Sequence, residues 1–369
     1  MLRPFITTLH DPELPLPSET TWYEKALTDI EHFSISPQIL FYLEQRNAVH
    51  QTPVFFQKAL KQQANQAFLQ NLYIKRKMEQ ILAAFEEAHI YVIPLKGTHF
   101  IETYFGKLSA RWTSDIDLLI PQAELSQAAA VVRDLGFTID EEPIPAHFHL
   151  SFSQALPHSN IPLTVELHWG LLQERTSQLS MDEFWAESKP IQTSEYIREL
   201  SDYHTFYMIC LHGWRHHLNC LKYFIDILRV ISVIGPQFDW KRLEREMIRQ
   251  GTEQRIRKTL SIVYQQFPHL KPVNIFPLTS NTTRWWEYEA IRNHDYKTYK
   301  QYANMFCFEF LDFDSPRDRL RKLATWFIPG QAMAAYECKA VGDEDSHGSS
   351  LFKLYKQRWG QFAAMISRK

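Results

Sequence analysis

The stretch 111-RWTSDIDLLIPQ-122 places two aspartates in a run that otherwise has the composition of a buried strand. In an extended chain successive side chains point to opposite faces, so Asp115 and Asp117 share one face while Ile116 and Leu118 share the other. Buried charges are rare without a partner, and two neighbouring carboxylates repel each other. A hard divalent cation between them removes this repulsion. The stretch therefore predicts a strand whose polar face binds a metal ion.

Short apolar runs on either side of this stretch predict a small sheet. They are 90-IYVIPL-95, 137-FTIDEE-142, 147-HFHLSFS-153 and 162-PLTVELHW-169. Between them, 97-GTHFIETYFG-106 and 123-AELSQAAAVVRDLG-136 predict short helices, the second of which is stopped by its glycine. The middle of the chain is therefore expected to be a small unit of mixed strands and helices.

Helical periodicity dominates both flanks of this unit. In 57-QKALKQQANQAFLQNLYIKRKMEQILAAFEEA-88, apolar residues including Phe68, Leu72 and Phe85 recur at steps of three and four, which predicts one buried face. Further helices are expected in 202-DYHTFYMICLHGWRHHL-218, 221-LKYFIDILRVISVI-234 and, with Asp239 as N-cap, 239-DWKRLEREMIRQG-251. The segments 271–300 and 341–350 are expected to be a connection and a loop.

These patterns predict an α+β fold in three parts: an N-terminal helical region (1–89), an α/β core (90–195) and a helical C-terminal domain (196–369). A chain of 369 residues exceeds the size at which one core usually stops growing. With 45% hydrophobic residues it is expected to fold. A formal net charge of -2 gives no global basic field for nucleic acid or an anionic membrane.

The cysteines and the apolar segments bear on the compartment. Cys210, Cys220, Cys307 and Cys338 show no CxxC spacing, which suits a reducing compartment and argues against zinc. The first twenty residues lack a signal-peptide core, and no segment approaches 18 apolar residues without a charge. A cytoplasmic protein with no membrane contact is therefore expected.

Two further motifs bear on the chemistry. In 162-PLTVELHW-169, Glu166 and His168 alternate with the apolar Val165 and Leu167, so Glu166 is a candidate third carboxylate if this strand neighbours the aspartate strand. Three carboxylates suffice to hold two Mg²⁺ ions about 3.5–4 Å apart. Gly97 sits at a strand-to-helix turn, where backbone N–H groups and the helix dipole favour phosphate.

The motifs 94-PLKGTHFIETYFGKLSARWTSDIDLLI-120 and 165-VELHW-169 together resemble the uncharacterised nucleotidyltransferase family of the DNA polymerase β-like superfamily. That family has a Leu-Lys-Gly turn, an Arg before an Asp-Ile-Asp-Leu-Leu strand, and a Glu-Leu-His-Trp strand, in this order. Its helical region is matched by 210-CLHGWRHH-217, 223-YFIDILRV-230 and 238-FDW-240. The resemblance covers about residues 72–250 and implies a small mixed sheet of the polymerase β-like type.

The resemblance also implies roles for particular residues. Asp115, Asp117 and Glu166 would be the catalytic acids and ligate Mg²⁺ or Mn²⁺, with two ions expected. Glu166 could also accept the proton of the attacking hydroxyl. Gly97 and Thr98 take the place of the superfamily's Gly-Ser turn, which holds the nucleotide triphosphate. The neighbouring Lys96 departs from the usual surroundings of that turn, so its role at the nucleotide is left open.

Two sets of basic residues have competing interpretations. Arg111, four positions before Asp115, is a candidate phosphate contact because guanidinium binds phosphate oxygens in pairs, and equally a partner of the aspartates. His168 is a candidate substrate or carboxylate contact. The remaining histidines do not predict zinc, because the usual companion ligands are missing from their motifs. They are His147, His149, His212, His216 and His217.

The expected activity is transfer of a nucleoside monophosphate from an NTP to a hydroxyl or phosphate acceptor, with release of pyrophosphate. The acceptor is open, with a small molecule or protein favoured over long RNA because the net charge is near neutral. One alternative is a non-catalytic nucleotide-binding or interaction module on the same fold. A metal-dependent glycosyltransferase is less favoured, because such enzymes usually place a large α/β half before their Asp-x-Asp motif.

Overall fold

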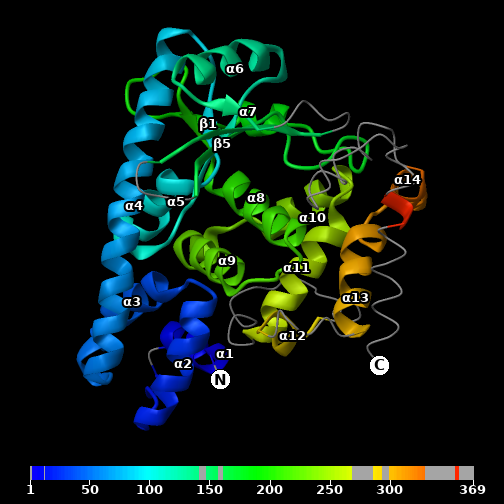
Figure 1. Cartoon of the computed structure of the whole chain (residues 1–369). Helices are drawn as coiled ribbons and strands as arrows, with labels where there is room; N and C mark the ends of the chain where they lie inside the picture. Colours follow the sequence, from blue (N-terminus) through cyan, green and yellow to red (C-terminus); the bar gives the residue numbers. More distant parts are fainter. Residues whose placement is uncertain are drawn as a thin grey trace.

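A computed structural model of the chain describes residues 2–11, 13–140, 147–156, 161–267, 286–292, 299–328 and 354–356. The expected connection within 271–300 and the expected loop at 341–350 lie mainly or wholly outside these residues. Figure 1 shows a small sheet at one end of the molecule, helices at the other, and one long helix running past both. The α+β class predicted from the motifs is confirmed.

The sheet has five strands in the order β1-β2-β5-β4-β3. Strands β2 and β5 are parallel and all other neighbours are antiparallel, so the sheet is mixed. The strands are β1 (Ile93–Pro94), β2 (Asp115–Leu119), β3 (Thr138–Ile139), β4 (His149–Gln154) and β5 (Leu163–His168). Two more, β6 (Lys189–Pro190) and β7 (Arg198–Glu199), form a separate pair. Every apolar run named from the sequence therefore contributes a strand.

One face of the sheet is covered by the long helix α4 (Val54–Glu87) and by α6 (Leu125–Asp134). Alternate residues of β2 and β5, such as Ile116, Leu118 and Val165, pack there in a core that α4 completes with Phe85. This alternation leaves the opposite face of the sheet to Asp115, Asp117, Glu166 and His168. The period-2 pattern of the strands thus separates a packed face from a polar one.

The polar face is turned toward α5 (Gly97–Phe105) and the helices that follow the sheet. Besides α4, α5 and α6, the described α-helices are α1 (Leu2–His10), α2 (Thr20–His32), α3 (Ser36–Gln45), α7 (Asp182–Ala186), α8 (Asp202–Arg215), α9 (Leu221–Ile234), α10 (Trp240–Arg249), α11 (Glu253–Gln266), α12 (Tyr288–Arg292), α13 (Tyr299–Phe306) and α14 (Pro316–Phe327). Asp239 caps α10 as expected, its Oδ1 accepting from the Arg242 N–H at 2.8 Å. Helix α13 continues directly into a π-helical turn, Cys307–Leu311.

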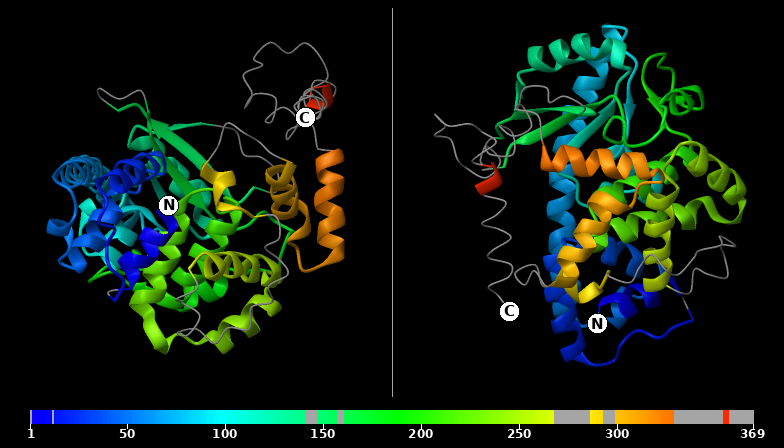
Figure 2. Two further views of the ribbon diagram at one scale, coloured as in Figure 1. Left: turned by 90° about the horizontal axis from the view of Figure 1, so that it is seen from below. Right: turned by 90° about the vertical axis from the view of Figure 1, so that its right-hand side faces the viewer.

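The N-terminal helices and the helices after the sheet share one hydrophobic core, which α5 also joins. Figure 2 shows α1 to α3 lying alongside the later helices in both views. The N-terminal helices and the described helices after the sheet therefore pack together. The boundaries at residues 89 and 195 stay a prediction, since they were drawn from changes of periodicity rather than from packing.

The buried face of α4 differs from the expected one. Phe68 is 41% exposed and Leu72 is 47% exposed, so their assignment to the buried face was wrong. The side chain buried instead is Asn71, whose amide donates to the carbonyl oxygens of Leu108 and Arg111 at 2.6 Å each. These bonds bind the long helix to the segment that leads into β2. A buried amide was invisible to a search for apolar periodicity.

Candidate active site

The two carboxylate strands are hydrogen-bonded neighbours. Strands β2 and β5 run parallel with Asp117 opposite Glu166, and paired residues of neighbouring strands point to the same face. Asp115, two residues before Asp117, shares this face. The adjacency that the sequence left open is thus present. Asp117 is almost completely buried, with 2% of its surface exposed, whereas Glu166 is partly exposed.

Two cationic groups contact the buried Asp117. The Lys96 ammonium lies 3.0 Å from its Oδ2, and the Nε2 of His168 lies 3.1 Å from its Oδ1. The same Nε2 of His168 is 3.1 Å from Oε2 of Glu166, so this imidazole bridges the two acids. The prediction that His168 touches a carboxylate is therefore met by its geometry. Lys96 also lies 2.9 Å from Nε2 of His212 on α8.

These contacts set the protonation of the site. Burial alone would raise the pKa of Asp117, but the charge of Lys96 and the hydrogen bond from His168 hold that pKa well below its usual range. Burial would lower the pKa of His168, and its bonds to Asp117 and Glu166 raise it instead. Burial would raise the pKa of Glu166, but the hydrogen bond from His168 together with the charges of His168 and His149 lowers it. Both acids are therefore anionic near neutral pH.

Gly97 brings the start of α5 against the aspartate strand. Its φ is +69°, and a Cβ at this position would lie 3.3 Å from the carbonyl oxygen of Asp115. Only glycine fits a left-handed residue at such close approach without strain. The helix N-terminus, with its free N–H groups, is thereby held beside the carboxylates. Thr98 is fully buried, and its hydroxyl donates to Sδ of Met78 at 3.7 Å rather than toward the acids.

Arg111 is paired with another acid. Its Nε and Nη2 each donate to a carboxylate oxygen of Asp226 on α9 at 2.8 Å, and both side chains are buried. Its Nη1 donates to the carbonyl of Trp112 at 3.1 Å. The guanidinium therefore anchors the segment before β2 to the helical region. Arg111 therefore pairs with Asp226 rather than with Asp115 or Asp117, and this carboxylate engages the guanidinium fork that was a candidate for binding phosphate.

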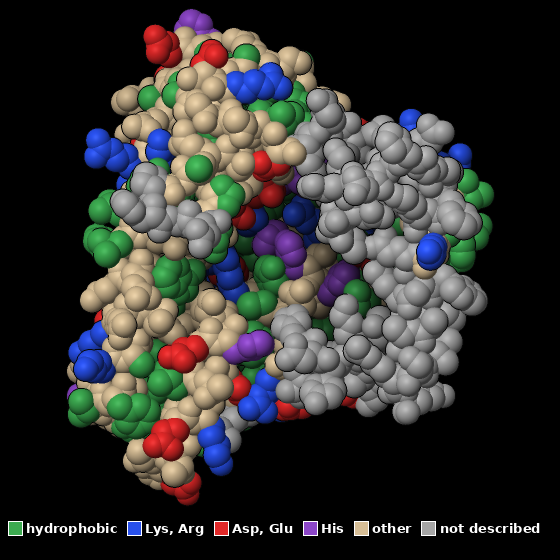
Figure 3. Space-filling model, in the orientation of Figure 1, with side chains coloured by type: hydrophobic (Ala, Val, Ile, Leu, Met, Phe, Trp, Pro, Cys, Tyr) green, Lys and Arg blue, Asp and Glu red, His purple; other side chains and the backbone are tan. Residues whose placement is uncertain are grey.

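Basic side chains from α8 lie near the acids around a small hollow. A small cavity is lined by Lys96, His168, His212 and Arg215, among others. Figure 3 shows that histidine, lysine and arginine side chains gather in a hollow of this face of the molecule. Among the described residues, Lys222 on α9 forms no ion pair with a carboxylate, and burial lowers its pKa to about 8. The charge of Arg111 also lowers the pKa of Lys222, whereas the charges of Asp226 and Asp115 raise it.

The closest metal-ligand group on this face includes a residue that was not expected. One ligand atom each from His149, Glu166 and His168 lies within 4.8 Å of the other two. His149 is paired with His168 across β4 and β5. Asp115 and Asp117 lie outside this group. The sharing of ions by Asp115, Asp117 and Glu166 stays a prediction, and in the structure Lys96 and His168 contact Asp117.

Four residues near the site had been given no role there. His149 and His212 were named only among the histidines that do not predict zinc, although alternation along β4 places His149 on the face opposite Leu150. His212 and Arg215 on α8 and Lys222 on α9 lie more than forty residues after β5, and only tertiary contacts bring them here, such as those of α9 with α5 and of His212 with Lys96. No local pattern marks such residues, since their role depends on tertiary contacts.

Comparison with known proteins gives a family match. The family model described as "Uncharacterised nucleotidyltransferase" matches residues 24–268, about two thirds of the chain. No curated protein matches the sequence significantly. A solution structure of the antibiotic-resistance factor ANT(2'')-Ia is similar at 14% identity and a TM-score of 0.30, over 53% of this chain and 93% of that one. The described helices include none long and apolar enough to cross a membrane. By its family match, this chain belongs to the uncharacterised nucleotidyltransferases.

Proposed function

We propose that this protein is a metal-dependent enzyme that transfers a nucleoside monophosphate from an NTP to an acceptor, releasing pyrophosphate. The observation that carries the proposal is the pairing of Asp117 with Glu166 across β2 and β5, on the face that also holds Asp115. A wall of basic side chains faces these acids. Phosphoryl chemistry requires carboxylates that bind metal ions and, opposite them, cationic groups that bind the phosphates.

The acids fit a hard divalent cation. Asp117 Oδ2 is buried and lacks a hydrogen-bond donor of good geometry, although the Lys96 ammonium lies 3.0 Å away. Lys96 supplies the cation that this buried anionic oxygen needs in the structure, and carboxylate oxygen is also the ligand that Mg²⁺ or Mn²⁺ prefers. Asp115 and Asp117 would hold the ion, with Glu166 as third acid. When bound, it would neutralise charge on the phosphates and orient them.

The basic groups supply the complementary half of the site. We assign Lys96, Arg215 and Lys222 to the triphosphate, together with the free N–H groups at the start of α5. Among the described residues, Arg215 forms no ion pair. Its guanidinium lies over the ring of Phe148, 5.0 Å from the ring centroid. Its charge is therefore available to an anion. Gly97 contributes through its backbone, and the Thr98 hydroxyl is not needed for this contact.

The reaction follows from this arrangement. An acceptor oxygen attacks the α-phosphorus, and the bond from that phosphorus to the pyrophosphate oxygen breaks. Glu166, whose side chain is 21% exposed against 1% for Asp117, is the acid that an acceptor hydroxyl can reach. It would accept the hydroxyl proton, and His168 holds it in position. Positioning and charge neutralisation, rather than covalent catalysis, would provide the rate.

An acceptor region adjoins the basic wall through Arg215. This residue also lines a second cavity of about 160 Å³, together with Phe148, Trp214, Glu309 and Lys322. The aromatic walls and the charges of both signs suit a small polar molecule or a protein side chain. The size of the cavity argues against a folded RNA. The acceptor is thus proposed to enter between the sheet and the C-terminal helices.

The test uses NTPs labelled at the α- or the γ-phosphate, incubated with the full-length protein, Mg²⁺ or Mn²⁺, and pools of small-molecule and protein acceptors. With α-labelled NTP, we expect the label to appear on the acceptor. With γ-labelled NTP, we expect the acceptor to stay unlabelled. Transfer of the γ-phosphate alone would overturn it. Tight NTP binding with no transfer to any acceptor would favour the non-catalytic module, and turnover of a nucleotide sugar would favour the glycosyltransferase.

A further inference from the structure

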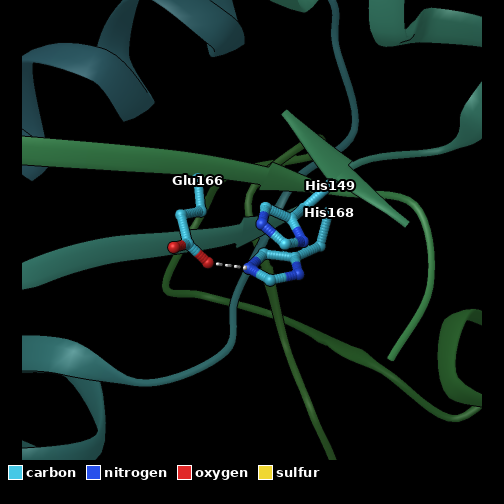
Figure 4. A group of neighbouring side chains, drawn as sticks. All are labelled: His149, Glu166 and His168. Atoms are coloured by element: carbon cyan, nitrogen blue, oxygen red, sulfur yellow. Dashed lines mark ion pairs between the residues drawn. The ribbon is translucent and has the colours of Figure 1, made fainter. Parts of the chain in front are cut away.

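Three side chains on the polar face of the sheet form a compact group of candidate metal ligands that contains two histidines. His149 on β4 is directly opposite His168 on β5, and Glu166 lies two residues before His168 on the same face. Figure 4 shows the two imidazoles and the carboxylate drawn together beside the strands. One ligand atom from each lies within 4.8 Å of the others. Each is held by a strand of the sheet rather than by a loop.

The spacing of the group fits ligands of one ion. Oε2 of Glu166 and Nε2 of His168 are 3.1 Å apart. Two ligands that each lie about 2.1 Å from a cation are separated by about 3.0 Å at a right angle and about 3.4 Å at a tetrahedral angle. The observed separation falls in this range. The ring centroids of His149 and His168 are 5.1 Å apart, so both imidazoles reach the same space.

Unpartnered nitrogen atoms give independent support. Nδ1 of His149 and Nδ1 of His168 are both buried without a hydrogen-bond partner, and His168 as a whole is only 4% exposed. Buried polar atoms are nearly always hydrogen-bonded, so two orphaned nitrogens in one cluster need an explanation. A cation on this face would give the buried Nδ1 of His149 a partner, whereas Nε2 of His168 already contacts Asp117 and Glu166 and only its Nδ1 lacks a partner.

The donor set selects the kind of cation. Mg²⁺ prefers six oxygen ligands at near-octahedral geometry, whereas imidazole suits Zn²⁺ and its first-row neighbours. Two imidazoles with one carboxylate are the ligands of known catalytic zinc and non-haem iron sites. We propose that His149, Glu166 and His168 bind one transition-metal dication of the Zn²⁺ and Co²⁺ type, separate from the hard cation at Asp115 and Asp117. The inference deepens the proposed function, because Glu166 belongs to both sets.

The two groups of ligands are expected to bind two different ions with different roles. The hard cation would lie on the aspartate side, nearest the triphosphate. The transition-metal ion would lie on the side of His149, where Glu166 meets the acceptor. A softer cation there would fix Glu166 and His168 on the sheet and add positive charge on the acceptor side. The expected consequence is that the two ions are bound independently and with opposite preferences.

The test titrates Co²⁺ into the full-length protein after metal has been removed by chelation and dialysis. We expect one equivalent to bind with visible d–d absorption, and a large excess of Mg²⁺ not to displace it. His149→Gln and His149→Asn should each weaken Co²⁺ binding at least about 10-fold. His216→Gln, which changes a histidine that stacks on Tyr223, is the matched control and should leave binding unchanged.

The outcomes separate this inference from the proposed function. Asp115→Asn should abolish nucleotidyl transfer while leaving Co²⁺ affinity within about threefold, since Asp115 is outside the group. Co²⁺ binding of wild-type strength in both folded His149 variants, or displacement by equal Mg²⁺, would overturn the second site. Circular dichroism of each variant establishes its fold. A protein that binds Co²⁺ through His149 without transferring nucleotide would retain the site and lose only the proposed reaction.

Discussion

Arg111 and Asp226 form a buried, two-pronged ion pair between the segment before β2 and helix α9. Both hydrogen bonds measure 2.8 Å, and the side chains are 2% and 1% exposed. The ring of Phe100 lies 5.4 Å from the guanidinium carbon. Because this pair joins the aspartate strand to the helix that carries Lys222, it fixes the distance between the acids and the basic wall. Its integrity is therefore a condition for the geometry of the site.

Removing one member of this pair should destabilise the protein. Asp226→Asn leaves the guanidinium buried with a neutral partner, and breaking a buried pair in this way costs about 3–5 kcal/mol. Urea denaturation followed by tryptophan fluorescence measures the loss. The control is Glu183→Gln, which breaks the exposed pair with Arg249 and should cost less than about 1 kcal/mol. Equal losses in the two variants would contradict the structural role of the pair.

Neutralising the more exposed aspartate should remove activity without unfolding the chain. Asp115→Asn keeps size and shape but removes a charge that the proposed cation needs, so kcat/KM for transfer should fall at least about 100-fold. Asp134→Asn, at the exposed end of α6, is the control and should change neither activity nor stability. Retention of full activity by Asp115→Asn, with thermal unfolding unchanged, would remove Asp115 from the mechanism.

Substitution of Gly97 should affect the site more than an equally strained glycine elsewhere. Gly97→Ala introduces a Cβ about 3.3 Å from the Asp115 carbonyl at a φ of +69°. Gly106→Ala has a φ of +76° with nothing within 4 Å, so it isolates the cost of the backbone conformation, on the order of 1 kcal/mol. Both should lower stability by about that amount. Only Gly97→Ala should also raise the KM for NTP, which steady-state kinetics measures.

The affinity for NTP should fall as pH rises through about 8. Burial and the charge of Arg111 lower the pKa of Lys222 to about 8, against the opposing charges of Asp226 and Asp115, with Lys96 as a further nearby cation. A lysine is charged below its pKa, so its contribution to triphosphate binding is present at pH 7 and is lost above pH 8. The measurement is the Kd of a non-hydrolysable NTP between pH 6.5 and 9.5.

Lys222→Arg provides the control for this prediction. An arginine keeps its charge across the whole range, so the variant should lose the pH dependence around 8. Lys222→Met should bind weakly at every pH. A wild-type profile that is flat between pH 7 and 9, or one that persists unchanged in Lys222→Arg, would show that another group titrates and that Lys222 does not contact the phosphates.

The local sequence determined the elements and the carboxylates. Strand β2 and its alternating faces follow from 115-DIDLL-119, because the side-chain period of a strand is fixed by backbone geometry. The same rule placed Glu166 and His168 on one face, and the family motifs indicated their chemistry. The Lys-Gly turn could be located because glycine is needed where the backbone turns left-handed. These are properties of a few neighbouring residues, and they hold wherever the segment lies.

Only the tertiary structure decided how the elements meet. Three features of the site join residues that are far apart in sequence. They are the register of β2 on β5, the pairing of Arg111 with Asp226, and the positions of Lys222 and His212 near the acids. Asn71 likewise was buried because its amide meets carbonyls of another segment, although it interrupts the apolar pattern of α4. Such contacts depend on how whole faces pack, and the free energy of packing is a sum over the fold that no short motif contains.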